Sequence, residues 1–225
     1  MDKEAEIPPG GHRQVRFAVP EQATEIVLVR HGETVRADPS RPFPLLDGHG
    51  DPELAPQGLD QADRIARILE GTKVDAIYVT PLRRTGETAA PLAKRTGITP
   101  QVEPGLREVR LGEWEGGLYR HKIISRDPLA LEMVERERWD VIPGAESNEE
   151  LAARVTEAIG NISSANPGGR VVVFSHGGAI GMVLALATRS RPFAFVAVDN
   201  GAISTIVVSG DQWFLRGFND VCHLA

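Results

Sequence analysis

The sequence predicts an α/β protein of three layers, with a mainly parallel central sheet, helices on both faces of it and an antiparallel C-terminal edge. Short β-branched runs alternate with longer segments of helical period, the pattern of strands connected through helices. The last two β-branched runs are joined by "SGD", which indicates a hairpin and therefore the antiparallel edge. The 225 residues show no compositional break, which favours a single domain.

Five apolar, β-branched runs are the candidate strands. "EIVLV", "VDAIYV" and "RVVVF" come first, and "AISTIVV" and "QWFLRGF" form the predicted hairpin. In chain order they cover residues 25–29, 74–79, 170–174, 202–208 and 212–218.

Helical periodicity fills the segments between these strands. "SNEELAARVTEAI" opens with Ser147 and Glu150, a capping box that marks a helix start. Residues 177–189 are apolar almost all round, which predicts a helix buried against the sheet, whereas the less regular segment 110–144 is expected to pass over the site in partly helical form. A helix over 56–71 ends at a glycine and places one apolar set on a single face: Leu59, Ala62, Ile65, Ala66 and Leu69.

Composition narrows the function classes. A formal net charge of -6 argues against a general affinity for nucleic acid, and the apolar segments are too short to span a bilayer, so we expect neither partner. The only cysteine, Cys222, permits no intrachain disulfide and lies too near the end of the sequence to be a phosphatase nucleophile, which favours a cytoplasmic setting. Residues 1–23 mix charge with Pro and Gly and predict a flexible leader before a catalytic domain at 24–225.

Three of the strands end in the same kind of polar motif. "EIVLV" runs into Arg30 and His31, "DAIYV" into "TPLRRT", and "RVVVF" into Ser175 and His176. Ligands of open α/β sheets bind at the carboxyl ends of the strands, so these motifs are expected to meet. Guanidinium groups match phosphate oxygens, and Gly32 and the glycine-rich turn into the last helix would let backbone approach an anion. A phosphoryl site is therefore predicted.

Two imidazoles and a carboxyl would supply the chemistry of that site. A neutral imidazole can attack phosphorus, and a second, protonated imidazole can stabilise charge on the transferring oxygens. The loop "GLREVRLGEWEGG" offers Glu108, Glu113 and Glu115 as acids for the leaving oxygen. We expect Trp114, Gly116 and Gly117 of this loop to form a packing turn.

The sequence resembles the histidine phosphatase superfamily, the phosphoglycerate mutase-like enzymes. The resemblance lies in "LVRHGET", "TPLRRTGETA", "LREVRLGEWEG", "PGAES" and "VVFSHGGAI", in the family's order, and extends from about Thr24 to the end of the sequence through "DNGAIS" and "FNDVCHL". Five ordered segments are far more specific than an isolated Arg-His-Gly.

The resemblance implies a role for each matching residue. His31 is the nucleophile that becomes phosphorylated, and Glu108 is the proton donor to the leaving oxygen. His176 completes the pocket, and the spacing from Thr80, which replaces a usual Ser, selects Arg84 over Arg83. The resemblance implies a reaction without metal or other cofactor. The substrate-binding set implied is Arg30, Thr34, Arg84 and Gly177.

Three other readings remain open. "VVVFSHGG" has the context of a serine hydrolase elbow, although Val173 stands where that turn requires a glycine. "DGHGD" places Asp47, His49 and Asp51 at alternating positions that could bind a metal. The third reading is a non-catalytic module that binds a phosphate ligand. Loss of either histidine would have favoured it, and both are present.

Within the family, hydrolysis is favoured over mutase chemistry. A mutase needs a closed site with additional basic residues that bind the substrate, whereas the segment 116–145 is short and its acidic residues balance its basic ones. We expect a phosphomonoesterase for small phosphorylated metabolites, and leave a homodimer open. Ala37 replaces a frequent Asn, and the loop that follows to Leu54 is unusually long, so that specificity is not transferable. The candidate grips, residues that could contact an anionic or sugar group of the substrate, are Arg110, Tyr119, Arg120, His121 and Lys122.

Overall fold

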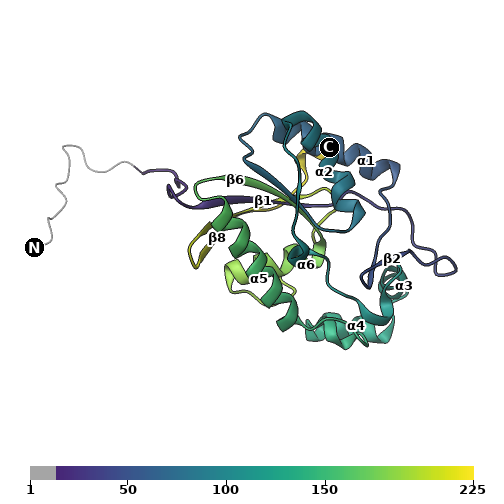
Figure 1. Cartoon of the computed structure of the whole chain (residues 1–225). Coiled ribbons are helices and arrows are strands. Elements are labelled where there is room, and N and C mark those ends of the chain that lie inside the picture. Colours follow the sequence, from purple (N-terminus) through teal and green to yellow (C-terminus); the bar gives the residue numbers. More distant parts are fainter. Residues whose placement is uncertain (1–13) are drawn as a thin grey trace, which may run out of the picture.

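A six-stranded sheet forms the centre of the part of the chain that the computed structural model describes, residues 14–225 (Figure 1). Its order is β5-β4-β6-β1-β7-β8. The pairs β5/β4, β4/β6 and β6/β1 are parallel, and β1/β7 and β7/β8 are antiparallel. The predicted fold class is therefore confirmed. The strands are β1 Thr24–Arg30, β4 Ala76–Val79, β5 Gln101–Val102, β6 Arg170–Ser175, β7 Ile203–Ser209 and β8 Gln212–Asp220.

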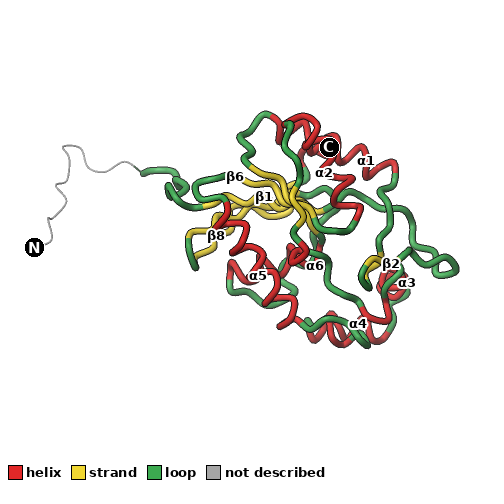
Figure 2. Tube along the Cα trace, in the orientation of Figure 1, coloured by secondary structure: helices red, strands yellow, loops and turns green. Residues whose placement is uncertain are grey.

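Strand β1 lies between β6 and β7, and its alternate residues serve two separate cores. Ile26 and Leu28 pack with α5 (Asn148–Ala165) and α6 (Gly177–Thr188), whereas Val27 and Val29 pack with α1 (Pro56–Glu70) and α2 (Arg83–Thr96). Figure 2 shows these helix pairs on opposite faces of the sheet. Both sides of the strand are buried, which explains why its sequence is continuously apolar.

The predicted helices are present, with one correction and one omission. The capping box joins Ser147 and Glu150 at the start of α5, and nine consecutive residues of α6 are buried. Leu59, however, is 54% exposed, because it lies in the first turn of α1 on the solvent side. Helix α2 was not predicted, because it contains Gly86 and Pro91 and buries mainly small or polar residues.

Two excursions cover the carboxyl ends of β1, β4 and β6. The loop after β1 carries the hairpin of β2 (Leu45–Leu46) and β3 (His49–Gly50). The predicted segment 110–144 carries α3 Leu118–Ile124 and α4 Pro128–Arg136. Four 3-10 turns complete the described chain: Pro104–Leu106, Gly112–Trp114, Trp139–Val141 and Cys222–Leu224.

The predicted leader falls mostly outside the described residues. Of 1–23, the structure describes only 14–23, which precede β1 without forming a helix or strand. Across residues 14–225, each helix is too short or too polar to cross a membrane.

Candidate active site

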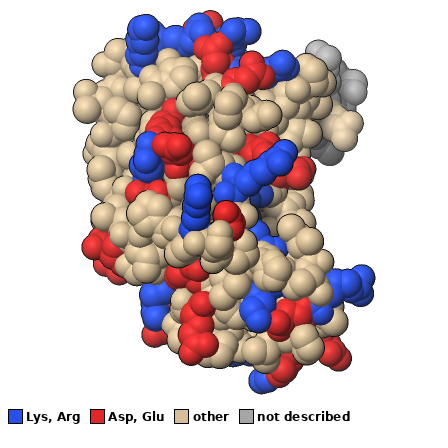
Figure 3. Space-filling view, turned by 90° about the vertical axis from the view of Figure 1, so that its right-hand side faces the viewer, with Lys and Arg blue, Asp and Glu red and all other residues tan. Residues whose placement is uncertain are grey.

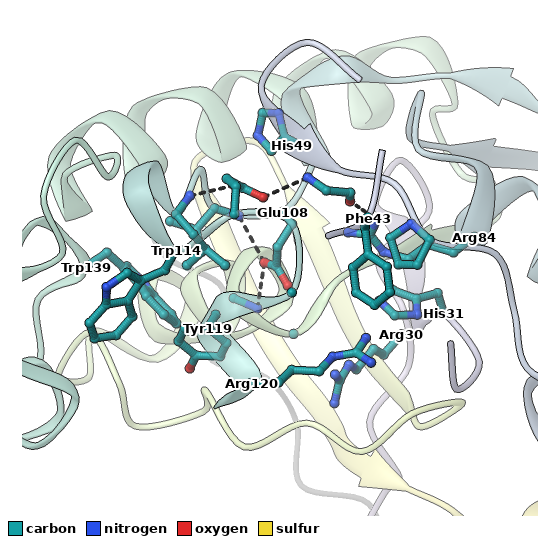
Figure 4. A pocket seen from close by; sticks show the side chains of 18 of the residues that line it. Arg30, His31, Phe43, His49, Arg84, Glu108, Trp114, Tyr119, Arg120 and Trp139 are labelled. Carbon is teal, nitrogen blue, oxygen red and sulfur yellow. Dashed lines mark hydrogen bonds between the residues drawn. The ribbon is translucent and has the colours of Figure 1, made fainter. Parts of the chain in front are cut away.

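A cavity of about 320 Å³ lies where the three strand exits converge (Figure 4). Arg30 and His31 reach it from the end of β1, Arg84 from the first turn of α2, and Glu108 from the loop after β5. Its remaining walls come from the Glu108 loop, the two excursions, the start of α6 and the segment before β7: Phe43, His49, Gly50, Pro52, Val109, Leu111, Trp114, Glu115, Gly117, Tyr119, Arg120, Trp139, Gly177, Gly178, Val196, Ala197 and Val198.

His31 is buried and its tautomer is set by the backbone. Its Nδ1 lies 2.8 Å from the carbonyl oxygen of Gly32, which can only accept, so Nδ1 carries the proton. Nε2 is then left as an unprotonated nitrogen. Burial, followed by the charges of Arg84 and Arg30, holds the pKa of His31 well below 6.5. The side chain is therefore a neutral imidazole with the electronic form of a nucleophile.

Three guanidinium groups surround His31. Arg84 donates to the carbonyl oxygen of Gly50 at 2.8 Å, and burial lowers its pKa to about 10, so it stays charged at neutral pH. Arg30 donates to the carbonyl oxygen of Val198, and its buried Nε has no hydrogen-bond partner within residues 14–225. Arg120 comes from α3 and stands beside Arg30. This set matches the charge and geometry of a phosphoryl group.

The concentration of positive charge is internal to the molecule. On the face shown in Figure 3, acidic and basic side chains are interspersed. Because Arg30 and Arg84 are largely withdrawn from solvent, their attraction for an anion is screened much less than that of surface charges.

Of the two carboxylates that line the cavity, Glu108 is the one that keeps an oxygen free. Its Oε1 accepts from the backbone N–H groups of Val109 and Gly178 at 3.0 Å and of Ala179 at 3.3 Å. Its Oε2 makes none of the hydrogen bonds found among residues 14–225. Glu115 also lines the cavity, but Leu111 and Gly50 occupy one of its oxygens each, at 2.7 Å.

Arg154 of α5, which sequence reasoning missed, fixes the backbone of the Glu108 loop. Its guanidinium donates to the carbonyl oxygens of Gly105, Arg107 and Glu108 at 2.7, 2.8 and 3.0 Å. It also donates to both carboxylate oxygens of Glu146, at 2.6 and 2.8 Å. The "PGAES" motif therefore acts through Glu146, which holds Arg154 in place.

His176 lies behind His31 and does not line the cavity. The ring centroids are 5.2 Å apart, and the Nε2 of His176 is 2.9 Å from the hydroxyl of Thr80. Its buried Nδ1 lacks a partner among the described residues. Burial, followed by Arg84 and His31, holds its pKa well below 6.5. The expected protonated imidazole is therefore wrong for this environment, where the ring is neutral.

Two expectations about backbone and anion are corrected. A Cβ on Gly32 would lie 2.5 Å from the carbonyl oxygen of Gly58, so this glycine is required by α1 rather than by an anion. The N–H groups of Gly178 and Ala179 at the start of α6 are taken by Glu108. Gly177 does line the cavity.

Of the other predicted residues, some line the cavity and some lie outside it. Thr34 is buried and accepts from Arg120. Arg83 points away from the site into ion pairs with Glu53 and Glu87, which agrees with the choice of Arg84. Of the candidate grips, Tyr119 and Arg120 line the cavity, whereas Arg110, His121 and Lys122 do not. The predicted packing turn is present, with Trp114 in the core and a positive φ at Gly116 and Gly117, and Trp114 and Gly117 also line the cavity.

The rival motifs lack the geometry that they need. Ser175 is 1% exposed and donates to the carbonyl oxygen of Leu106 at 2.8 Å, so it is not placed as a nucleophile. Within residues 14–225, no group of three or more His, Cys, Asp or Glu side chains is arranged to hold a metal ion. In "DGHGD", Asp51 accepts from the N–H of Arg83, and His49 instead lines the cavity.

Comparison with known proteins agrees with this geometry. Residues 26–221 match the family model of the histidine phosphatase superfamily (branch 1). The chain is 35% identical to phosphoglycerate mutase-like protein 4 of Arabidopsis thaliana over 207 residues, 89% of this chain and 86% of that protein. It is 32% identical to the metal-independent phosphoserine phosphatase of the same plant over 212 residues, 92% and 86% of the two chains.

A solved structure shows the same fold. A mycobacterial glucosyl-3-phosphoglycerate phosphatase superimposes with a TM-score of 0.72 and 27% identity, covering 88% of this chain and 99% of that one.

Proposed function

This chain belongs to the histidine phosphatase superfamily, and we propose that it hydrolyses phosphate monoesters of small metabolites through a phosphohistidine formed on His31. The observation that carries the proposal is the state of His31, a neutral imidazole with Nδ1–H donated to Gly32 and three arginines around it. An imidazole held in this way attacks phosphorus while the guanidinium groups neutralise the phosphoryl oxygens.

In the first step, Nε2 of His31 forms a bond to phosphorus as the bond between phosphorus and the ester oxygen breaks. Glu108, protonated on Oε2, gives its proton to the departing oxygen, so an alcohol leaves and a carboxylate remains. The positive charge that develops on the imidazole is shared through Nδ1–H with the carbonyl oxygen of Gly32, 2.8 Å away.

In the second step, a water molecule attacks the phosphorus. Glu108 accepts a proton from that water, the bond between phosphorus and Nε2 breaks, and inorganic phosphate leaves with His31 again neutral. Neither step requires a metal ion. His176, joined to Thr80 behind the reacting ring, is proposed to hold His31 in place.

Mutase chemistry is the second candidate, since several relatives carry phosphoglycerate mutase or mutase-like names. The placement of the basic residues of α3 and α4 favours hydrolysis. Arg120 lines the cavity, but Lys122 pairs with Asp127, and Arg136 pairs with Glu132, away from it. A mutase requires further cations around a substrate that must be held in two orientations, away from water.

The wider setting is part of the proposal. We place the enzyme in the cytoplasm as one catalytic domain over 24–225, supported by the single cysteine and by the family match over 26–221. The net charge of -6 supports the absence of a nucleic-acid partner. A homodimer is to be tested by light scattering.

The test compares hydrolysis of a panel of phosphate esters by the wild type, His31→Ala and Arg83→Ala, each with and without a chelator. Arg83 is the matched control, because it neighbours Arg84 but points to solvent. We expect activity in the wild type and in Arg83→Ala with or without chelator, and none in His31→Ala. Full activity in His31→Ala would refute the mechanism. Strong conversion of 3-phosphoglycerate to its 2-isomer would replace the phosphatase with a mutase.

A further inference from the structure

The cavity has two chemically different ends, with Glu108 between them. In Figure 4, Arg30, His31 and Arg84 lie on one side of Glu108, and Trp114, Tyr119 and Trp139 lie on the other. The three aromatic rings form a row, with 6.3 Å between the centroids of Trp114 and Tyr119 and 6.1 Å between those of Tyr119 and Trp139. An ester whose phosphoryl group sits at His31 therefore projects its alcohol past Glu108 towards these rings.

The charged side chains that line the cavity are engaged at the other end or by the backbone. Arg30, Arg84 and Arg120 all act on His31. Glu108 accepts three backbone N–H groups on one oxygen, and Glu115 accepts one on each of its two oxygens. The Nζ of Lys122 lies 5.8 Å from the centroid of the Trp114 ring, but it pairs with Asp127 and does not line the cavity. Of the charged side chains that line the cavity among the described residues, none is left free at the aromatic end for a carboxylate or an ammonium group.

The aromatic end also offers a neutral polar group. The hydroxyl of Tyr119 makes none of the hydrogen bonds found within residues 14–225, and burial beside the Glu108 carboxylate raises its pKa to about 12. It is therefore a protonated donor at neutral pH, available to an oxygen of the alcohol part of the substrate.

From this arrangement we infer that the preferred substrates are phosphate esters of small uncharged alcohols that carry an aromatic or other apolar group. The inference rests on the proposed function and concerns its leaving group. An alcohol with a carboxylate or ammonium group would lose hydration there and find no oppositely charged partner. The cavity, about 320 Å³, stands at the small end of the range of ligand sites, roughly 300–1,000 Å³. One ring beside the phosphate is therefore the fitting size.

The first test measures kcat/KM for three primary-alcohol esters, so that leaving-group reactivity differs little between them. They are 2-phenylethyl phosphate, ethyl phosphate and phosphoserine. Burial of a phenyl ring predicts a preference of roughly tenfold to a hundredfold for the first over the second. Phosphoserine is expected to be the poorest of the three. Equal or better hydrolysis of phosphoserine would overturn the inference.

The second test assigns that preference to the aromatic row. Tyr119→Ala is compared with His121→Ala, an exposed position on the same helix α3 that does not line the cavity. We expect Tyr119→Ala to lower kcat/KM for 2-phenylethyl phosphate by about tenfold and that for ethyl phosphate by less than about twofold. His121→Ala should match the wild type. An equal loss for both esters would show that the ring supports the fold and does not select the substrate.

The two proposals fail differently. If all esters are inert, or if His31→Ala hydrolyses them as well as the wild type, the proposed function fails. If His31 is required and phosphoserine is the better substrate, the function stands and the inference about the leaving group fails. Should Tyr119→Ala not fold, the ester series on the wild type still decides the inference.

Discussion

The Nδ1 atom of His31 donates a hydrogen bond to the carbonyl oxygen of its neighbour Gly32 over 2.8 Å. This bond leaves Nε2 unprotonated, and burial next to Arg84 and Arg30 keeps the ring neutral. His176, 5.2 Å away between ring centroids, is kept neutral by the same causes. Two buried neutral histidines affect stability as well as chemistry.

The free energy of unfolding should fall as the pH is lowered from about 7 to about 5. The pKa values of His31 and His176 are lowered by folding, so below 6.5 the unfolded chain binds more protons than the folded one. Each histidine can contribute up to about 1.4 kcal/mol per pH unit in this window, which lies above the titration of most carboxyls. Urea denaturation at several pH values measures the slope. A slope that His31→Gln/His176→Gln leaves unchanged would contradict this origin.

Thr80 should matter through His176. Its hydroxyl is the only hydrogen-bond partner of the His176 ring among residues 14–225, at 2.9 Å. Thr80→Val is expected to lower kcat by about tenfold, because the imidazole loses its orienting bond, with KM changed much less. Thr80→Ser keeps the hydroxyl and should restore the rate. Equal loss in both variants would indicate a packing effect of the Thr80 methyl group instead.

Arg154 should act as a positioning residue for Glu108. Glu108→Gln is expected to slow hydrolysis of alkyl esters by roughly 10²- to 10⁴-fold, and of 4-nitrophenyl phosphate far less, because that leaving group needs no proton. Arg154→Lys should also slow alkyl esters more than 4-nitrophenyl phosphate, by a smaller factor than Glu108→Gln. One ammonium group cannot replace the donors to Gly105, Arg107 and Glu108 together. The ratio of the two rates is the readout. A ratio equal to that of the wild type would reduce Arg154 to a purely structural role.

Gly32 should be required for stability, with Gly86 as its control. A Cβ at position 32 would meet the backbone of Gly58 at 2.5 Å, whereas one at position 86 would meet nothing within 4 Å. Gly32→Ala is expected to cost about 1–3 kcal/mol or more, and Gly86→Ala, inside α2, to stabilise by about 0.5–1 kcal/mol. Thermal denaturation of both variants tests this. A Gly32→Ala protein as stable as the wild type would show that the two backbones can separate.

The sequence was sufficient for five of the six strands of the sheet and for the residues at their exits, whereas β5, which has only two residues, was not predicted. Buried parallel strands read as unbroken apolar runs, and polar residues directly after them must emerge at the carboxyl edge. Arg30 and His31 were placed at the cavity by this logic, whereas the choice of Arg84 over Arg83 and of Glu108 among the acids of its loop came from the resemblance. Arg84 and Arg83 differ in direction because consecutive helical residues point about 100° apart.

What the sequence did not reveal depends on tertiary contact. Arg154 is one more charged residue on an amphipathic helix, and nothing local indicates that it faces three carbonyl groups. Trp114 and Trp139 belong both to the core and to the cavity wall. An aromatic residue in a sequence does not indicate whether it lines a cavity as well as packing in the core. Gly32 was assigned to the anion because the close approach of Gly58, which belongs to α1, has no local sequence signal.

The phosphohistidine proposed on His31 can be trapped and identified in the protein. The enzyme is mixed with a fast substrate, quenched in alkali within the first turnovers, digested and analysed by mass spectrometry, because phosphohistidine survives alkali. We expect one added phosphoryl group on the peptide that contains His31, lost in His31→Ala and retained in Arg83→Ala. A phosphoryl group on any other residue, or steady turnover by the His31→Ala protein, would contradict this proposal.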